Sequence, residues 1–74
     1  MAQTAKIGLA QAQFGALPAG GGCIREPRLI GVSAAKRLIM LGKLVGAEDA
    51  LRIGLVDEIC APEQLMARAF ALAA

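Results

Sequence analysis

The sequence predicts a mainly α-helical fold that includes one or two short extended segments. Glycines at positions 31, 42 and 54 divide the chain after residue 22 into stretches of helical length, and glycine often follows the last residue of a helix. Within those stretches apolar residues recur three or four positions apart, which is the spacing of one helix face. Apolar residues make up 57% of the chain and charged residues 19%, so the composition excludes intrinsic disorder.

A chain of 74 residues forms one small domain or a piece of one, and at this length folding buries only about 60% of the unfolded surface. We therefore expect a single partial domain over residues 1–74. Residues 1–6 are polar and are predicted to be frayed. Residues 7–22 are predicted to be extended and glycine-rich, because apolar and polar residues alternate weakly and Pro18 and three glycines then break the pattern. The alanines in this stretch also permit a helical turn.

Residues 23–74 are predicted to be helical, with a short strand or extended link near 55–59. Helices are expected over 23–30, from the N-cap Ser33 to Gly42, over 48–53, and from Pro62 onward. The last helix has an apolar side that consists of Leu65, Met66, Ala69, Phe70 and Ala73.

The composition excludes several classes of function. A net charge of +2 without Trp or Tyr is too weak a basis for nucleic-acid binding. The chain has no histidine, and Cys23 and Cys60 match no zinc pattern, so no metal site is expected. Residues 7–24 are uncharged, but glutamines, a proline and glycines interrupt them, which excludes a membrane span. We expect a cytoplasmic protein with two free thiols and no membrane partner.

Glycine-marked motifs follow one another at fixed distances, and together they resemble the enoyl-CoA hydratase/isomerase family, the crotonases. The resemblance covers nearly the whole chain, from Lys6 onward, without a gap. The motifs are, in order, Pro18-x-Gly20-Gly21-Gly22-x-x-Arg25-x-x-Arg28-x-x-Gly31, Leu41-Gly42, Ala47-Glu48-Asp49-Ala50-x-x-x-Gly54-Leu55-Val56, and Ile59 with Pro62.

The resemblance implies a fragment of a crotonase-type α/β spiral built from ββα turns. The family's domain is about three times longer than this chain, which therefore resembles a truncated middle-to-C-terminal segment. The resemblance places the family's oxyanion-hole N–H groups and its first catalytic Glu in a segment that lies before these residues. It implies no cofactor, and a coenzyme A thioester as the possible substrate.

Gln11 stands where the family's hydratases carry a catalytic Glu after a Pro, because Ala10-Gln11 takes the place of that Pro-Glu pair. A carboxyl group can pass a proton between water and the substrate's α-carbon, and a neutral amide cannot. Loss of a general acid–base typically lowers a rate by ~10²–10⁴. The resemblance therefore leaves it open whether the chain is an enzyme, although the family does contain members with other groups at this position.

Leu17, Pro18, Gly20 and Gly21 occupy the positions that shape the family's substrate pocket wall. A tight turn before a helix explains the same glycines, and we favour that interpretation. The run departs from the family pattern at Ala19, which replaces the usual first Gly, and further along at Glu26, where the family prefers Leu.

Three functional hypotheses follow, in decreasing order of preference. The first is a truncated crotonase-like protein that is inactive alone and forms a homo-oligomer through exposed apolar faces. The second is an acyl-CoA hydratase or isomerase that acts as an oligomer or as part of a longer chain. The third is a small helical protein-interaction module.

Overall fold

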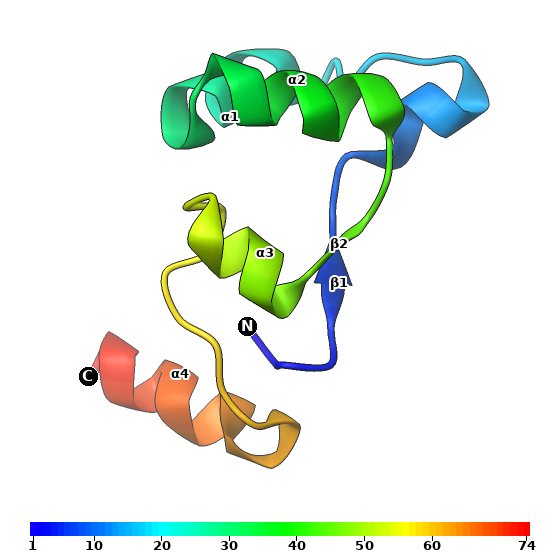
Figure 1. Ribbon diagram of the computed structural model, residues 1–74. Helices are drawn as coiled ribbons and strands as arrows, with labels where there is room; N and C mark the ends of the chain where they lie inside the picture. Colours follow the sequence, from blue (N-terminus) through cyan, green and yellow to red (C-terminus); the bar gives the residue numbers. More distant parts are fainter.

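The fold is mainly helical with a short two-stranded sheet, as the sequence predicts (Figure 1). A computed structural model describes residues 1–74. No helix combines the length and the apolar character that crossing a bilayer requires. The elements are β1 (Lys6–Ile7), the 3-10 helix η1 (Ala10–Phe14), α1 (Gly22–Ile30), α2 (Val32–Leu41), β2 (Val45–Gly46), α3 (Ala47–Arg52), the 3-10 helix η2 (Pro62–Gln64) and α4 (Leu65–Ala73).

The elements form an elongated molecule with a helical layer at one end and α4 at the other (Figure 1). Helices α1 and α2 pack on each other, and η1 packs on α2. The antiparallel pair of β1 and β2, in which Lys6 faces Gly46 and Ile7 faces Val45, leads from this layer to α3. Among the helices and strands, α4 packs only against η2, the turn that immediately precedes it. The molecule measures 37 × 21 × 21 Å.

The hydrophobic core is very small. Its buried apolar side chains are Ala35 and Leu38 on α2 and Ala47 and Ala50 on α3. The accessible surface is 5304 Å², whereas a compact protein of 7.6 kDa exposes about 4,300 Å². The radius of gyration is 13.3 Å, against about 11 Å for a compact chain of this length. About 1,000 Å² of surface is thus exposed beyond what a compact fold would leave.

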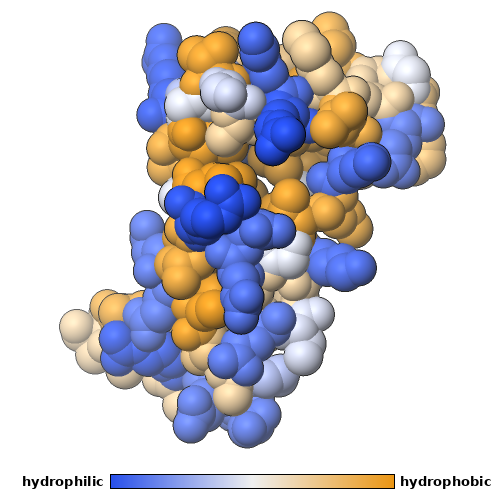
Figure 2. Space-filling view, viewed as in Figure 1, coloured by the Kyte–Doolittle hydropathy of each residue, from blue (hydrophilic) through white to orange (hydrophobic).

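Large apolar side chains reach the solvent along most of the chain. Figure 2 shows apolar surface over the α1–α2 layer and through the middle of the molecule. Because exposed apolar area opposes solubility as a monomer, a surface of this kind is typical of an interface. The exposed large apolar residues are Ile7, Phe14, Leu17, Ile24, Leu29, Val32, Met40, Leu41, Leu44, Leu51, Leu65, Met66, Phe70 and Leu72.

The predicted fraying of residues 1–6 is wrong, because these residues are tied to the segment before α4. The N-terminal ammonium of Met1 donates to the carbonyl of Glu58 at 2.7 Å. Ala2 and Cys60 form a parallel β-bridge, in which the Gln3 N–H donates to the Cys60 carbonyl at 2.8 Å. These partners lie more than 55 positions away in the sequence, so local polarity does not reveal them.

Of the two alternatives for residues 7–22, the extended one holds for Ile7, whereas η1 forms the helical turn that the alanines permit. The 3-10 helix closes because Gly15 adopts φ 71° and its N–H donates back to Ala12 and Gln11 carbonyls. Glycine reaches this left-handed conformation without steric cost.

Of the two alternatives predicted near 55–59, the strand does not form, and the segment is an irregular link. The N–H groups of Leu55 and Val56 donate to the carbonyl of Ala50, at 2.9 and 3.3 Å, so they are unavailable for a strand ladder. The second strand lies instead at β2, between the helices predicted to end at Gly42 and to begin at residue 48.

The helix boundaries follow the glycines closely. Gly31 ends α1, and Gly42 ends α2 with φ 63° and ψ 21°. Gly31 is also the residue before α2, whose first residue is Val32, so the predicted N-cap role of Ser33 is wrong. The helix starts one residue earlier than Ser33 because α1 and α2 are joined by a single glycine.

Gly42 and Gly15 offer a matched test of packing at a helix end. Both residues end a helix in the left-handed conformation. An added Cβ at Gly42 would lie 3.2 Å from the Ala12 Cβ, whereas at Gly15 it would meet nothing within 4 Å. We expect Gly15→Ala to cost about 1–2 kcal/mol of unfolding free energy from the backbone alone. Gly42→Ala should cost about 1–3 kcal/mol more from crowding.

The measurement is unfolding in urea followed by circular dichroism, at one protein concentration for both variants. Equal losses for the two substitutions would contradict the close approach of η1 to the end of α2.

Helix α4 is attached to the rest of the chain by an exposed ion pair. Arg68 donates through Nε and Nη2 to the two carboxylate oxygens of Glu58, the latter contact measuring 3.2 Å. The hydrogen bond from Arg68 lowers the pKa of Glu58, and the charge of the N-terminal ammonium lowers it further. The same hydrogen bond raises the pKa of Arg68.

The attachment of α4 should therefore weaken in acid. The folded pKa of Glu58 lies below its ordinary value of 4.5. The pair thus contributes stability above the unfolded pKa, and this contribution is lost as the pH falls through the folded pKa. Hydrogen exchange of the α4 amides, corrected for intrinsic rates, should show less protection at pH 3 than at pH 6. Arg68→Gln should reduce protection at pH 6 and remove most of the pH dependence; an unchanged pH dependence in this variant would assign the effect to another group.

Candidate functional site

Gln11 lies in η1 as a half-buried residue with an unpaired side-chain oxygen. Its Oε1 atom is inaccessible to solvent and has no hydrogen-bond partner in the chain. A buried acceptor without a donor typically costs about 1–3 kcal/mol. The oxygen is therefore an unpaired acceptor that is enclosed within the folded chain.

Gln13 fixes the position of η1 and hence of Gln11. Its Nε2 donates to the carbonyl of Gly42 at 2.5 Å, which joins η1 to the end of α2. The sequence analysis did not assign this role to Gln13, because the partner carbonyl lies 29 positions away.

The predicted pocket-wall residues form the turn that leads into α1. Leu17 is exposed and Pro18 is buried. Gly21 adopts φ 114° as the residue before α1, a conformation that favours glycine. The N–H groups of Gly20 and Gly21 donate to no group of the chain. Two free donors beside a helix N-terminus can bind a ligand oxygen.

Pro18 holds this turn against the segment that precedes Gln11. A Cβ added at Gly22 would lie 2.8 Å from the Pro18 Cβ and 3.1 Å from Leu9 Cδ1. Only glycine permits this approach of the three residues. The structure thus brings the start of α1 next to the start of η1, although they are separated by the whole 15–21 loop.

The predicted site residues do not all line one cavity. An open apolar groove of about 470 Å³ runs over α1 and α2. Leu17 lines this groove, whereas Gln11, Pro18, Gly20 and Gly21 do not. The residues that line it are Ala12, Leu17, Cys23, Pro27, Val32, Ala35, Lys36, Ile39 and Met40.

Two further features escaped the sequence analysis. Glu26 Oε2 is inaccessible to solvent and unpaired, like Gln11 Oε1. The sequence hinted at this unpaired carboxylate only through the Glu at a position where the family prefers Leu. A second cleft, of about 260 Å³, is lined by Arg37, Lys43 and Arg52 beside apolar residues. Arg52 already pairs with Asp49 at 3.1 Å. The three cations come from separate elements, so no local motif identifies them.

No three of the His, Cys, Asp and Glu side chains gather where they could hold a metal ion. Both cysteines are free thiols, with Cys23 exposed near the start of α1 and Cys60 half-buried in the bridge to Ala2.

Comparison with known proteins assigns the fold and this arrangement of glycines to a family. The family model described as enoyl-CoA hydratase/isomerase matches residues 1–74, and the chain belongs to this family. Its helices and two-stranded sheet are therefore a fragment of the crotonase fold.

Individual relatives agree with this assignment. The chain is 51% identical over 73 residues to the fatty acid oxidation complex subunit alpha of Pseudomonas aeruginosa, which covers 99% of the chain and 10% of that protein. Among solved structures, enoyl-CoA hydratase from Bacillus anthracis matches with a TM-score of 0.93 and 38% identity, over 97% of this chain and 28% of that one. Pseudomonas aeruginosa DspI matches with a TM-score of 0.91 and 39% identity, over 97% and 28% of the two chains.

The chain spans about a tenth of the length of these curated relatives and less than a third of the solved chains. It is similar to one segment of each. The activity of a whole relative therefore does not transfer to these 74 residues without further argument.

The tie between Gln13 and Gly42 should be measurable as stability. Gln13→Ala removes the donor and leaves the Gly42 carbonyl unpaired, which should cost about 1 kcal/mol of unfolding free energy. Gln64 is a suitable control because it is exposed, also lies in a 3-10 helix, and its side chain forms no hydrogen bond. Gln64→Ala should change the unfolding free energy by less than about 0.5 kcal/mol. Equal effects would contradict a positioning role for Gln13.

Proposed function

We propose that the 74 residues act as a crotonase-type segment that has no hydratase activity of its own and self-associates through its apolar faces. The observation that carries this proposal is the ratio of buried to exposed apolar side chains. Four are buried, three of them alanines, while fourteen large ones are exposed. Removing apolar surface from water is the main driving force for association and contributes a free energy of about 25 cal/mol per Å² buried. A second molecule can bury the side chains that one chain leaves exposed.

The side chain at position 11 supports the absence of activity. Hydration of a 2-enoyl thioester needs a group that passes a proton between water and the α-carbon, and a Gln amide cannot do this at neutral pH. The oxygen of Gln11 is also inaccessible to solvent, so this side chain does not hold a water for attack either.

An acyl-CoA enzyme is the second candidate, either as an oligomer that completes a pocket or as part of a longer chain. The free N–H groups of Gly20 and Gly21 favour this candidate, because they can donate hydrogen bonds to an oxygen of a coenzyme A thioester. The relatives named for fatty acid oxidation and for enoyl-CoA hydratase favour the same substrate class. A small interaction module is the third candidate, and the exposed apolar face of α4 is the feature that favours it.

The proposed compartment is the cytoplasm. The two free thiols suit a reducing environment, and the proposal includes no cofactor and no metal.

Gln11→Glu separates the first two candidates. If the proposal is right, neither the wild-type protein nor Gln11→Glu hydrates a short 2-enoyl-CoA above the buffer rate, and saturating ligand does not raise the melting temperature. If a pocket is completed, Gln11→Glu should gain about 10²–10⁴ in rate. Gln3→Glu, the same change at an exposed residue away from the site, is the control. A gain in Gln11→Glu alone would overturn the proposal in favour of the acyl-CoA enzyme.

A further inference from the structure

Helix α4 carries an apolar stripe that faces away from its own chain. Leu65, Ala69 and Leu72 face a small cavity that Met1 and Cys60 also line. Residues three or four positions apart share a helix face, so a different set forms the outer side. This outer stripe, which we name the α4 stripe, consists of Met66, Phe70 and Ala73, with Glu63 one turn earlier in η2. Phe70 is 69% exposed.

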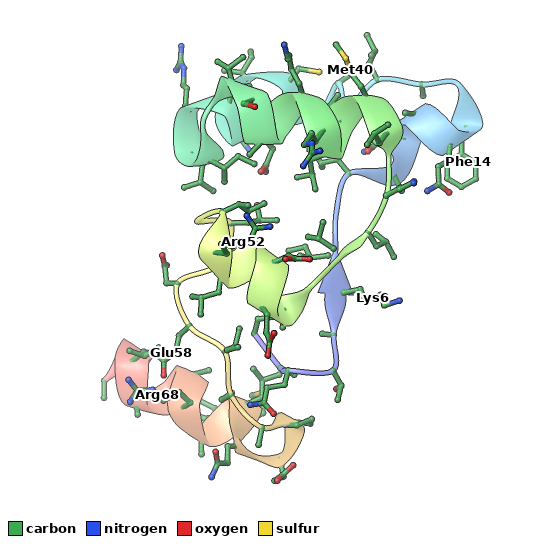
Figure 3. All side chains as sticks on the ribbon, viewed as in Figure 1. Lys6, Phe14, Met40, Arg52, Glu58 and Arg68 are labelled. Atoms are coloured by element: carbon green, nitrogen blue, oxygen red, sulfur yellow. The ribbon has the colours of Figure 1, made fainter.

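The apolar groove over α1 and α2 lies at the opposite end of the molecule. Met40 lines it and is 71% exposed. In Figure 3 the side chain of Met40 points away from the α3 and α4 end. Lys36 is the one charged residue that lines the groove.

We propose that the α4 stripe of one copy docks head-to-tail in the α1–α2 groove of a second copy. This inference rests on the self-association proposed above and assigns the surfaces that carry it. A single molecule cannot make the contact itself, because its groove and its α4 lie at opposite ends (Figure 1). Because the groove and the stripe face outward at opposite ends (Figure 1, Figure 3), a pair of copies leaves one groove and one stripe free, to which further copies can add.

The exposed area argues for a second copy as the occupant. The accessible surface of 5304 Å² exceeds that of a compact chain of this mass by about 1,000 Å². A stable interface of standard size buries about 800 Å² per partner. The surplus surface is therefore of the size that one dimer contact would remove. An apolar helix side seated in a hydrophobic groove is also a common mode of recognition.

Charge complementarity sets the direction of docking. Lys36 on the groove is positive, and Glu63 at the start of the α4 stripe is negative. Both residues are exposed and neither forms an ion pair in the chain. Placing Phe70 and Met66 in the groove brings one such pair together at each contact between two copies.

The experiment measures the monomer–dimer dissociation constant of the 74-residue chain by sedimentation equilibrium. Phe70→Glu and Met40→Glu place a charge on the stripe and in the groove, respectively. Each should raise the dissociation constant by more than about tenfold. Phe14→Glu makes the same change at a residue that is 83% exposed and lies outside both surfaces, so it should alter the constant less than about threefold.

A charge reversal keeps the test independent of folding. Lys36→Glu and Glu63→Lys should each weaken the dimer about three- to fivefold, and the double variant should return to within about twofold of the wild-type constant. Because neither residue is buried, both variants should retain the wild-type circular dichroism spectrum.

The outcomes separate the two proposals. A dimer that Phe70→Glu, Met40→Glu and the charge reversals leave intact would overturn the assigned surfaces while self-association stands. A wild-type chain that stays monomeric at all concentrations would overturn both. Weakening by the stripe and groove variants, together with recovery in the double charge variant, supports the assigned contact.

Discussion

The antiparallel pairing of β1 with β2 is the contact on which the arrangement of the molecule depends. It joins two small clusters of side chains that are packed separately, one where α1 and η1 meet α2, the other where α3 meets the strands. The buried residues are divided in the same way, with Ala35 and Leu38 in the first cluster and two alanines in the second. Only two residue pairs, Lys6 with Gly46 and Ile7 with Val45, make up the ladder. The distance between the clusters is therefore set by a very short stretch of backbone hydrogen bonds.

This division explains why association and folding are linked in the proposed function. Leu38 is the only large apolar side chain in the core, and neither cluster has the size to offset the conformational entropy of 74 ordered residues. Stability that one chain lacks can come from mass action when a second chain binds the folded form. Relatives in the family carry this segment within much longer chains. The apolar surfaces exposed in this segment are those available for contact with other polypeptide.

The sequence allowed accurate prediction of features that depend on neighbouring residues. Gly31 and Gly42 were identified as helix ends because a left-handed or otherwise unusual backbone is a local property of glycine. The tie of Met1 to Glu58 and the bridge of Ala2 to Cys60 were missed, since both depend on residues more than 55 positions apart. At the candidate site, the resemblance to the crotonases singled out Gln11, whose role stays a prediction, and the glycines indicated the turn before α1. The hydrogen bond of Gln13 to Gly42 and the unpaired state of the Gln11 oxygen depend on packing between segments that are distant in the sequence. The spacing of residues along the chain therefore does not predict them.

The short ladder has a further consequence for cooperativity. A structure unfolds in one step when every part shares contacts with the rest, and it opens in pieces when the connections are few. Here the two-residue ladder of β1 and β2 connects the α1–α2 layer to α3. Helix α4 is held to the preceding segment by the exposed ion pair of Arg68 and Glu58. The calorimetric enthalpy of unfolding of a single chain should therefore exceed the van't Hoff enthalpy. The molecule should therefore open as three loosely coupled units, which are the α1–α2 layer, α3 with the strands, and α4.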